Sequence, residues 1–301
     1  MESPITQECL PGQVSDAIQE SATVLSQRSL ASGTYAVRIS GQEIATKIQP
    51  GQFFMIRAAS STDPLLGRPF ALYDTVVDAN GSPTAFEFAY HVIGKMTGLM
   101  STWSEGEPVE LWGPLGNGFP VFEGKHLLCV GGGIGYTPFL AVARETLEQR
   151  QYGRDETRYQ SEPAAKRVTL CYGSQSKAAR ADLTDFDELP NLDIQLSTDD
   201  GSEGHHGLVT DLVQQMFDLP EAERPDGVYC CGPEPMMHAV ARLCFAANIP
   251  CWLSLETPMA CGFGACFSCV TKVNISEDEW DYRRTCVEGP IFPAETLAIP
   301  K

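Results

Sequence analysis

HLLCVGGGIGYTP, residues 126–138, decides the fold of the second half of the chain. HLLCV reads as a buried strand, and a tight turn into a helix is predicted by the glycines that follow: Gly131, Gly132, Gly133 and Gly135. The turn is not the G-x-G-x-x-G fingerprint, yet its backbone N–H groups and the helix N-terminus can hold a pyrophosphate. We expect Thr137 to cap that helix, with Pro138 at its first position. A tight turn without a ligand remains an alternative.

Strand and helix patterns alternate on either side of this turn. Strands are predicted at HLLCVGG, RVTLCYG, LDIQLST, DGVYCCG and IPCWLSL, and helices at 138–149, 183–189, 208–217 and 234–247. The alternation predicts an α/β domain with a doubly wound parallel sheet over residues 124–255. The polar segment 149–166 is expected to be an exposed insertion.

A second turn follows the strand DGVYC at Cys231, Gly232 and Pro233. The carboxyl ends of neighbouring strands bind ligands in a doubly wound sheet, so this turn is expected to face the same nucleotide as the first. Cys231 then lies beside a nicotinamide, or is a packed core thiol.

The first half of the chain has a different sequence pattern. Short β-rich segments separated by glycine and proline run from about residue 21 to 122: TYAVRIS, GQFFMIRA, PFALYDTVV, AFEFAYHVI and EPVELWG. They predict a small antiparallel β-barrel over residues 20–123, interrupted by one short helix near 96–103, with residues 1–19 as a loose extension. Within it, Arg68 can pair with a flavin pyrophosphate and Pro69 can stiffen its strand, although Arg-Pro in a strand also occurs for structural reasons.

Four of the eleven cysteines are clustered near the C-terminus, in a third unit over residues 256–301. Their spacing is C-x4-C-x2-C followed by sixteen residues and a last cysteine, which is the plant-type [2Fe-2S] pattern: Cys261, Cys266, Cys269 and Cys286. Gly262 and Gly264 let the backbone approach the sulfides and donate N–H bonds. The alternatives are a structural zinc site with four cysteine ligands and a group of buried free thiols.

Charge and composition limit the partners. The net charge of −18 argues against nucleic acid and anionic membrane surfaces. The sequence shows no secretory signal and no apolar stretch long enough to span a bilayer, so we expect a cytoplasmic protein. His205 and His206 stand in a polar loop without a third ligand and are expected to face solvent, as are Lys177 and Arg180, which could instead meet a 2′-phosphate.

The Arg-Pro barrel, the GGGIGxTP turn and the CGP motif, in this order, resemble the ferredoxin–NADP reductase superfamily. With ACGFGACFSCV and RRTCVEGPIF added, the chain resembles the electron-transfer subunits of two-subunit, NAD-linked dihydroorotate dehydrogenases over residues 20–297. This resemblance implies a β-barrel FAD domain, an α/β doubly wound nucleotide domain for NAD, and a small C-terminal [2Fe-2S] unit. The family's FAD contacts correspond to Arg68, Pro69, Phe70, Ala71, Tyr90, His91, Val92, Thr97 and Gly98.

Two positions depart from that family. Ala71 stands where Ser or Thr is usual, so a side-chain hydrogen bond toward flavin N5 is missing, and Met96 replaces a glycine of the expected phosphate turn.

The implied function is electron transfer from a separate FMN-containing, dihydroorotate-oxidising subunit through [2Fe-2S] and FAD to NAD+, in pyrimidine biosynthesis. The implied assembly is a heterotetramer of two subunits of each kind. Two alternatives stay open: the electron-transfer subunit of another reductase, such as a sulfite reductase, hydrogenase or transhydrogenase, and a non-enzymatic zinc or redox sensor.

Overall fold

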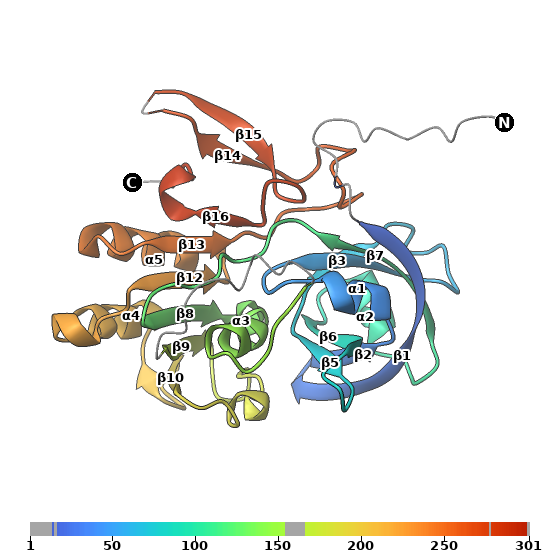
Figure 1. The fold of residues 1–301 in the computed structure, drawn as a ribbon, viewed down its shortest axis with the longest axis horizontal. Coiled ribbons are helices and arrows are strands. Elements are labelled where there is room, and N and C mark those ends of the chain that lie inside the picture. Colours follow the sequence, from blue (N-terminus) through green and yellow to red (C-terminus); the bar gives the residue numbers. More distant parts are fainter. Residues whose placement is uncertain (1–13, 15–16, 154–165, 277, 300–301) are drawn as a thin grey trace.

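The computed structural model describes residues 14, 17–153, 166–276 and 278–299. Figure 1 shows a β-barrel and an α/β unit side by side, with the C-terminal segment (red) lying along the top of both.

The barrel is an antiparallel sheet of seven strands in the order β4-β3-β7-β1-β2-β6-β5. The strands are β1 (Ile18–Ala31), β2 (Thr34–Ile39), β3 (Phe53–Ala58), β4 (Arg68–Ala71), β5 (Asp74–Val77), β6 (Pro83–His91) and β7 (Pro108–Leu115). The sheet curls on itself, because Phe70 of β4 packs on Phe88 of β6 with ring centroids 4.9 Å apart. Two short helices, α1 (Gln42–Lys47) and α2 (Lys95–Met100), complete the unit.

The expected barrel is confirmed, with three differences in detail. The strand expected at PFALYDTVV is two strands, β4 and β5, separated by the buried residues Leu72 and Tyr73. The long strand β1 was not predicted, because its buried side chains, such as Val24, stand among polar ones. It begins at Ile18, two residues before the expected domain start. Helix α1 was also not predicted.

The α/β unit has a seven-stranded sheet in the order β11-β10-β9-β8-β12-β13-β16. All strands are parallel except the edge strand β16. The strands are β8 (His126–Gly132), β9 (Arg167–Ser174), β10 (Leu192–Thr198), β11 (His205–His206), β12 (Gly227–Cys231), β13 (Cys251–Ser254) and β16 (Ile291–Pro293). The helices are α3 (Phe139–Thr146), α4 (Val209–Phe217) and α5 (Glu234–Ala247), with 3-10 turns at Gly133–Tyr136, Thr184–Phe186 and Glu221–Glu223.

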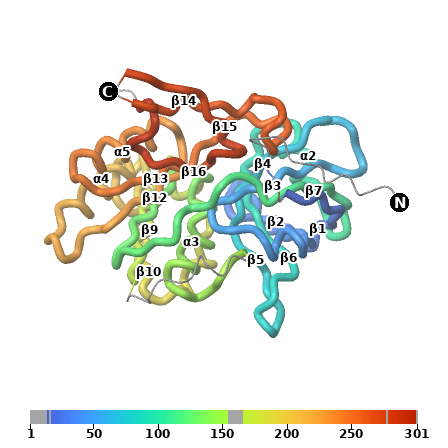
Figure 2. The backbone as a smooth tube through the Cα atoms, turned by 45° about the horizontal axis from the view of Figure 1, so that its top comes forward, coloured from blue at the N-terminus to red at the C-terminus, as the bar shows by residue number. Residues whose placement is uncertain are grey.

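Alternate residues of β8 divide this unit into two cores. Leu127 and Cys129 pack with α3 on the side facing the barrel, whereas Leu128 and Val130 pack with α4 and α5 on the other side. Figure 2, in agreement with Figure 1, shows α3 between the sheet and the barrel. Helix α3 is therefore one of the elements of the α/β unit that face the barrel.

Three expectations for the α/β unit are wrong in detail. The helix expected at 183–189 is only the 3-10 turn Thr184–Phe186. Thr137 does not cap α3, whose N-cap is Pro138 and carries no side-chain capping bond. The insertion expected at 149–166 was predicted to be exposed, and it begins with the exposed Gln149, but Tyr152 within it is buried at 1% exposure. Residues 154–165 of that insertion, like most of the expected extension 1–19, lie outside the described residues.

The C-terminal segment contains a loop, Cys261–Cys269, followed by a two-stranded hairpin of β14 (Val270–Asn274) and β15 (Trp280–Arg284). The chain then enters β16, which pairs antiparallel with β13, and continues into the 3-10 turn Ala294–Thr296. The C-terminal segment is thus anchored on the edge of the α/β sheet, while its loop reaches the barrel.

Candidate functional site

The two glycine turns lie side by side. β8 and β12 are adjacent parallel strands, and Cys231 at the end of β12 is in register with Gly131 at the end of β8. From β8 the chain continues on one side to β9 and β10, and later crosses to β12 on the other side. The order of strands reverses here, and ligands of doubly wound sheets bind at such a switch point.

Close packing explains why this turn needs glycine. A Cβ at Gly135 would stand 2.3 Å from the Cys231 carbonyl oxygen, and one at Gly132 would stand 2.5 Å from Met236 Sδ. Gly133 differs, because it is exposed, has φ +56° and has nothing within 4 Å of its Cβ position. The turn therefore leaves an open backbone surface at Gly133, which fits a nucleotide pyrophosphate.

Cys231 is buried at 6% exposure beneath this turn. Burial raises the pKa of its thiol to about 12, although a hydrogen bond with Ser254 opposes the rise. The thiol is therefore protonated at neutral pH. Gly232 (φ +154°) and Pro233 continue the chain into α5.

Strand β4 holds the residues expected to contact FAD, and all four of them are half-buried: Arg68, Pro69, Phe70 and Ala71. The Arg68 guanidinium donates to the carbonyl oxygens of Leu66 and Gly67, each at 3.0 Å. Within the described part of the chain, no carboxylate lies within ion-pair distance of Arg68. Its positive charge is thus available to an anionic ligand.

The second expected FAD segment runs from the end of β6 into α2. Tyr90 is buried, stacks on Tyr35 with centroids 5.6 Å apart, and donates to Gln27 Oε1 at 3.1 Å. His91 is exposed, with Nδ1 2.8 Å from Thr34 Oγ1, and Val92 is half-buried.

Helix α2 begins after Gly94. The Thr97 hydroxyl oxygen accepts from the backbone N–H groups of Ile93 and Gly94, both at 3.0 Å, and so fixes the entry into the helix. The side chain of Met96 is buried in the barrel core, while Gly98 is half-buried with nothing within 4 Å of its Cβ position. The methionine that replaces the family's glycine therefore points into the protein, which leaves the outer surface of the turn open.

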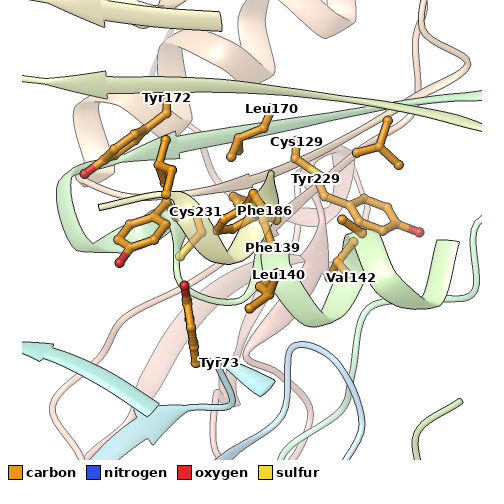
Figure 3. Close-up of a cluster of buried hydrophobic side chains, with 14 of the residues drawn as sticks. Tyr73, Cys129, Phe139, Leu140, Val142, Leu170, Tyr172, Phe186, Tyr229 and Cys231 are labelled. Carbon is orange, nitrogen blue, oxygen red and sulfur yellow. The ribbon is translucent and has the colours of Figure 1, made fainter. Parts of the chain in front are cut away.

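Tyr73, directly after β4, links the barrel to the nucleotide turn. Its ring meets that of Tyr136 edge-on at 6.2 Å, and its hydroxyl donates to Asp185 Oδ2 at 2.7 Å. Figure 3 shows Tyr73 reaching from the barrel toward the α/β unit, where Cys231 lies. Arg28 of β1 completes the link with an ion pair to Asp185. The turn at Gly131–Gly135 is thus held against the barrel beside β4.

A buried carboxylate ties the same two units together a second time. Asp74 of β5 lies 3.1 Å from Arg144 of α3 and 2.8 Å from Arg150, and it accepts from the Tyr152 hydroxyl at 2.7 Å. The side chains of Asp74, Arg144 and Arg150 are 10%, 20% and 18% exposed. Neither link was predicted, because charged residues 76 positions apart (Asp74 and Arg150) or 157 positions apart (Arg28 and Asp185) show no sequence spacing.

The hairpin of the C-terminal segment brings two of the four expected cluster ligands together. Cys269 precedes β14 and Cys286 follows β15, so pairing of the strands places their Sγ atoms 3.2 Å apart. Both cysteines are buried. The Thr285 N–H and hydroxyl donate to the Cys269 carbonyl at 2.9 and 3.0 Å, which fixes this end of the site.

The other two cysteines lie in the loop, Cys261 half-buried and Cys266 exposed. Hydrogen bonds from Ser268, first from its side chain and then from its backbone, lower the pKa of Cys266 to about 6. The loop needs glycine, because Gly262 and Gly264 have φ +80° and +92°. Among the described residues, no three His, Cys, Asp or Glu side chains are gathered tightly enough to hold a single metal ion.

This donor set fits an iron–sulfur cluster. Cysteine sulfurs are the ligands of such clusters, and the site offers four of them; the pKa of Cys266 is lowered, whereas burial raises the pKa of Cys286. At Gly262 the backbone of the cysteine loop lies directly against the barrel, since a Cβ there would stand 2.6 Å from Met55 Cγ.

The remaining candidates are exposed (Lys177, His206) or half-buried (Arg180, His205), and three of the four pair with a carboxylate. His205 lies 3.0 Å from Asp211, and His206 is exposed. Lys177 and Arg180 both pair with Glu203. None of the helices in residues 14, 17–153, 166–276 and 278–299 has the length and apolar character needed to cross a bilayer.

Solved structures share this architecture. The NADH-dependent reduced ferredoxin-NADP oxidoreductase, described for flavin-based electron bifurcation, aligns with a TM-score of 0.76 at 24% identity, over 92% of this chain and 89% of that one. The ferredoxin reductase in carbazole 1,9a-dioxygenase aligns with a TM-score of 0.61 at 23% identity, over 77% and 67%. The fold therefore belongs to the ferredoxin–NADP reductase class, and the sheet with its glycine turn matches the oxidoreductase NAD-binding domain family over residues 129–242.

The C-terminal segment and the close relatives specify the family. Residues 256–298 match the iron-sulfur cluster binding domain of dihydroorotate dehydrogenase B. The electron transfer subunit of dihydroorotate dehydrogenase B (NAD(+)) from Bacillus caldolyticus is 37% identical, over 93% of this chain and 99% of that protein. The subunit of the same name from Clostridium acetobutylicum is 33% identical, over 89% and 92%. The chain belongs to the family of dihydroorotate dehydrogenase B electron transfer subunits.

The comparisons confirm the expected resemblance and fold class, and with them an oxidoreductase component with the cofactor set FAD, [2Fe-2S] and NAD. The residue assignments within each site stay predictions. Sequence reasoning missed the barrel residues that contact the cysteine loop, such as Met55 and Trp112, because nothing in their own segments marks them.

Proposed function

We propose that this chain is the electron-transfer subunit of a two-subunit dihydroorotate dehydrogenase, which passes electrons from dihydroorotate oxidation to NAD+ in pyrimidine biosynthesis. Its partner is an FMN-containing catalytic subunit, in a cytoplasmic heterotetramer of two subunits of each kind. The domains are the barrel (20–123) for FAD, the α/β unit (124–255) for NAD and the C-terminal unit (256–301) for the cluster.

One observation carries the proposal: three candidate sites follow one another through direct contacts. Cys269 and Cys286 pack with Phe53 and Met55 of β3, which pairs with β4. Tyr73, just after β4, then packs on the nucleotide turn at Tyr136. A cluster site, a flavin site and a nicotinamide site in this order are what a relay needs.

When bound, the three groups supply complementary chemistry, since an iron–sulfur cluster carries single electrons, NAD accepts a hydride, and a flavin can do either. The hydride that reaches NAD contains one proton besides two electrons, and since a cluster carries electrons only, that proton comes from solvent; no side chain is assigned to transfer it. The residues bind and orient: the four cysteines hold the cluster, Arg68 pairs with the FAD pyrophosphate, and the Gly131–Gly135 turn holds the NAD pyrophosphate.

The remaining assignments follow the same division. We assign FAD contacts to Pro69, Phe70, Ala71, Tyr90, His91, Val92, Thr97 and Gly98, and NAD contacts to Thr137, Cys231, Gly232 and Pro233. Cys231 is buried as a neutral thiol, so its role beside the nicotinamide is contact rather than nucleophilic chemistry.

The cysteine loop is the side from which the partner's electrons enter. Cys266 is exposed, and the flanking Phe263 and Phe267 are 39% and 64% exposed. Exposed aromatic side chains around a redox loop suit a protein–protein contact, because aromatic residues are enriched in such interfaces.

Co-purification tests the proposal. The chain is tagged and co-expressed with the FMN-bearing dihydroorotate-oxidising subunit of the same source. We expect a complex that contains both subunits and reduces NAD+ with dihydroorotate. If the partner oxidises dihydroorotate but the tagged chain neither binds it nor confers NAD+ reduction, the proposed function is wrong.

A further inference from the structure

The indole of Trp112, in β7, lies between the cysteine loop and the segment that leads into β4. Its Nε1–H donates to the carbonyl oxygen of Cys261 at 2.8 Å. Its ring packs against Gly67, where a Cβ would stand 2.4 Å from Cη2 and 3.1 Å from Cζ2 of the indole. Gly67 precedes Arg68, so a single side chain contacts both a predicted cluster ligand and the residue that leads into the strand predicted to carry FAD.

Two further side chains extend this contact layer. Gly262 rests on Met55 and Leu115, because a Cβ at Gly262 would stand 2.6 Å from Met55 Cγ and 3.0 Å from Leu115 Cδ1. Met55 is fully buried and pairs in register with Pro69 of β4. The cysteine loop therefore packs directly on β3, the strand that pairs with β4.

Trp112 differs from the rest of this layer because it makes a directional bond. Met55 and Leu115 contact the loop only through dispersion and burial, whereas the indole N–H fixes the position of one carbonyl group. Hydrogen bonds to the residues that ligate a metal orient those ligands and tune the centre. Because the same ring packs against Gly67, the Cys261 carbonyl is held at a fixed position relative to the start of β4.

We infer that Trp112 is a positioning residue for electron transfer: it holds the cysteine loop at a fixed separation and orientation from β4. The inference rests on the proposed function and adds a residue to it. Trp112 forms no bond to either redox group and is neither oxidised nor reduced. The separation of two redox groups governs how fast an electron passes between them, so loosening this contact slows that passage while both groups stay bound.

Two substitutions separate the hydrogen bond of Trp112 from the packing of its ring. Trp112→Phe removes the N–H and keeps most of the ring, whereas Trp112→Leu removes the ring packing on Gly67 as well. Trp103→Phe is the matched control, because Trp103 is a buried barrel tryptophan (7% exposed) in a different core, and its Nε1 has no hydrogen-bond partner in the described structure.

Holoproteins of these variants are mixed with NADH anaerobically, and reduction of the flavin and of the cluster is followed separately by absorbance and freeze-quench EPR. Iron and FAD content and the cluster midpoint potential are measured on the same samples. We expect Trp112→Phe to keep iron, FAD and the rate of flavin reduction, but to reduce its cluster roughly 10-fold more slowly than Trp103→Phe, with Trp112→Leu slower still.

The proposed function and the positioning role of Trp112 would be contradicted by different results. If the wild-type protein contains no iron, or its cluster is not reduced after the flavin, the proposed function is wrong. If wild type behaves as proposed but Trp112→Phe reduces its cluster as fast as Trp103→Phe, the positioning role alone is wrong. Loss of iron from Trp112→Phe would also overturn that role, since the tryptophan would then be needed for cluster retention.

Discussion

Asp74→Asn removes the charge at the centre of the second link between the barrel and the α/β unit. The carboxylate is flanked by Arg144 at 3.1 Å, Arg150 at 2.8 Å and the Tyr152 hydroxyl at 2.7 Å. Because both guanidinium groups are at least four-fifths buried, the substitution leaves two poorly solvated positive charges without their counter-ion. Removing one member of a buried ion pair costs about 3–5 kcal/mol of folding free energy.

For a chain of this size, that loss corresponds to a fall in melting temperature of roughly 5–10 °C. The assay is thermal unfolding of the holoprotein, followed by circular dichroism and by flavin fluorescence. Asp63→Asn is the matched control, because Asp63 pairs with Lys95 at the surface, with side chains 72% and 66% exposed. A surface pair of this kind contributes about 0–1 kcal/mol, so its loss should move the melting temperature little.

The position of Asp74 adds a functional consequence. Two residues separate β5 from β4, and α3 follows the glycine turn, so the link sets how the turn faces the barrel. We therefore expect Asp74→Asn to slow flavin reduction by NADH while retaining most FAD. Equal melting temperatures and equal flavin reduction rates for Asp74→Asn and Asp63→Asn would refute this reasoning.

Two further predictions concern single sites. Cys266→Ser should lose iron and keep most FAD, since the cysteine loop and β4 are separate segments; iron and flavin analysis checks this, and wild-type protein that binds zinc and no iron would contradict the cluster assignment. Arg68→Ala should bind FAD roughly 10- to 100-fold more weakly than Lys95→Ala, because a charge-assisted pyrophosphate contact contributes about 1.5–3 kcal/mol, whereas Lys95 is exposed and pairs with Asp63. Equal FAD affinities in the two variants would remove the pyrophosphate role from Arg68.

The sequence predicted correctly those features that are determined by residues close together in the chain. Gly132 and Gly135 are required by contacts of 2.5 and 2.3 Å, and the strand before them alternates between two cores, so both features are present in the sequence itself. Strand β1 escaped prediction because its burial alternates irregularly and depends on two neighbours, β2 and β7. The helix expected at 183–189 shortens to a 3-10 turn, within which Asp185 bonds Tyr73 of the barrel.

The site was predicted unevenly for the same reason. Cysteine spacing marks the ligands, but it does not show that the hairpin brings Cys269 and Cys286 to 3.2 Å while Cys266 stays exposed. Contacts between distant segments, such as Trp112 with Cys261, 149 positions apart, have no sequence signature at all. The residues that join the three units therefore appear only in the folded chain.

The central claim is that electrons pass in series through the cluster site, the flavin site and the nucleotide site, and one pair of variants tests it most directly. Cys269→Ser removes a predicted cluster ligand, and Gly133→Trp places a bulky side chain on the open nucleotide turn, at a residue with φ +56°.

Each variant is assembled with the catalytic subunit and assayed for NAD+ reduction by dihydroorotate and for NADH oxidation with an artificial acceptor that draws electrons from the flavin. We predict that Cys269→Ser loses the coupled reaction and keeps NADH oxidation, and that Gly133→Trp keeps its cluster and loses both activities. Full coupled turnover by Cys269→Ser without a cluster would show that the cluster does not lie on the path.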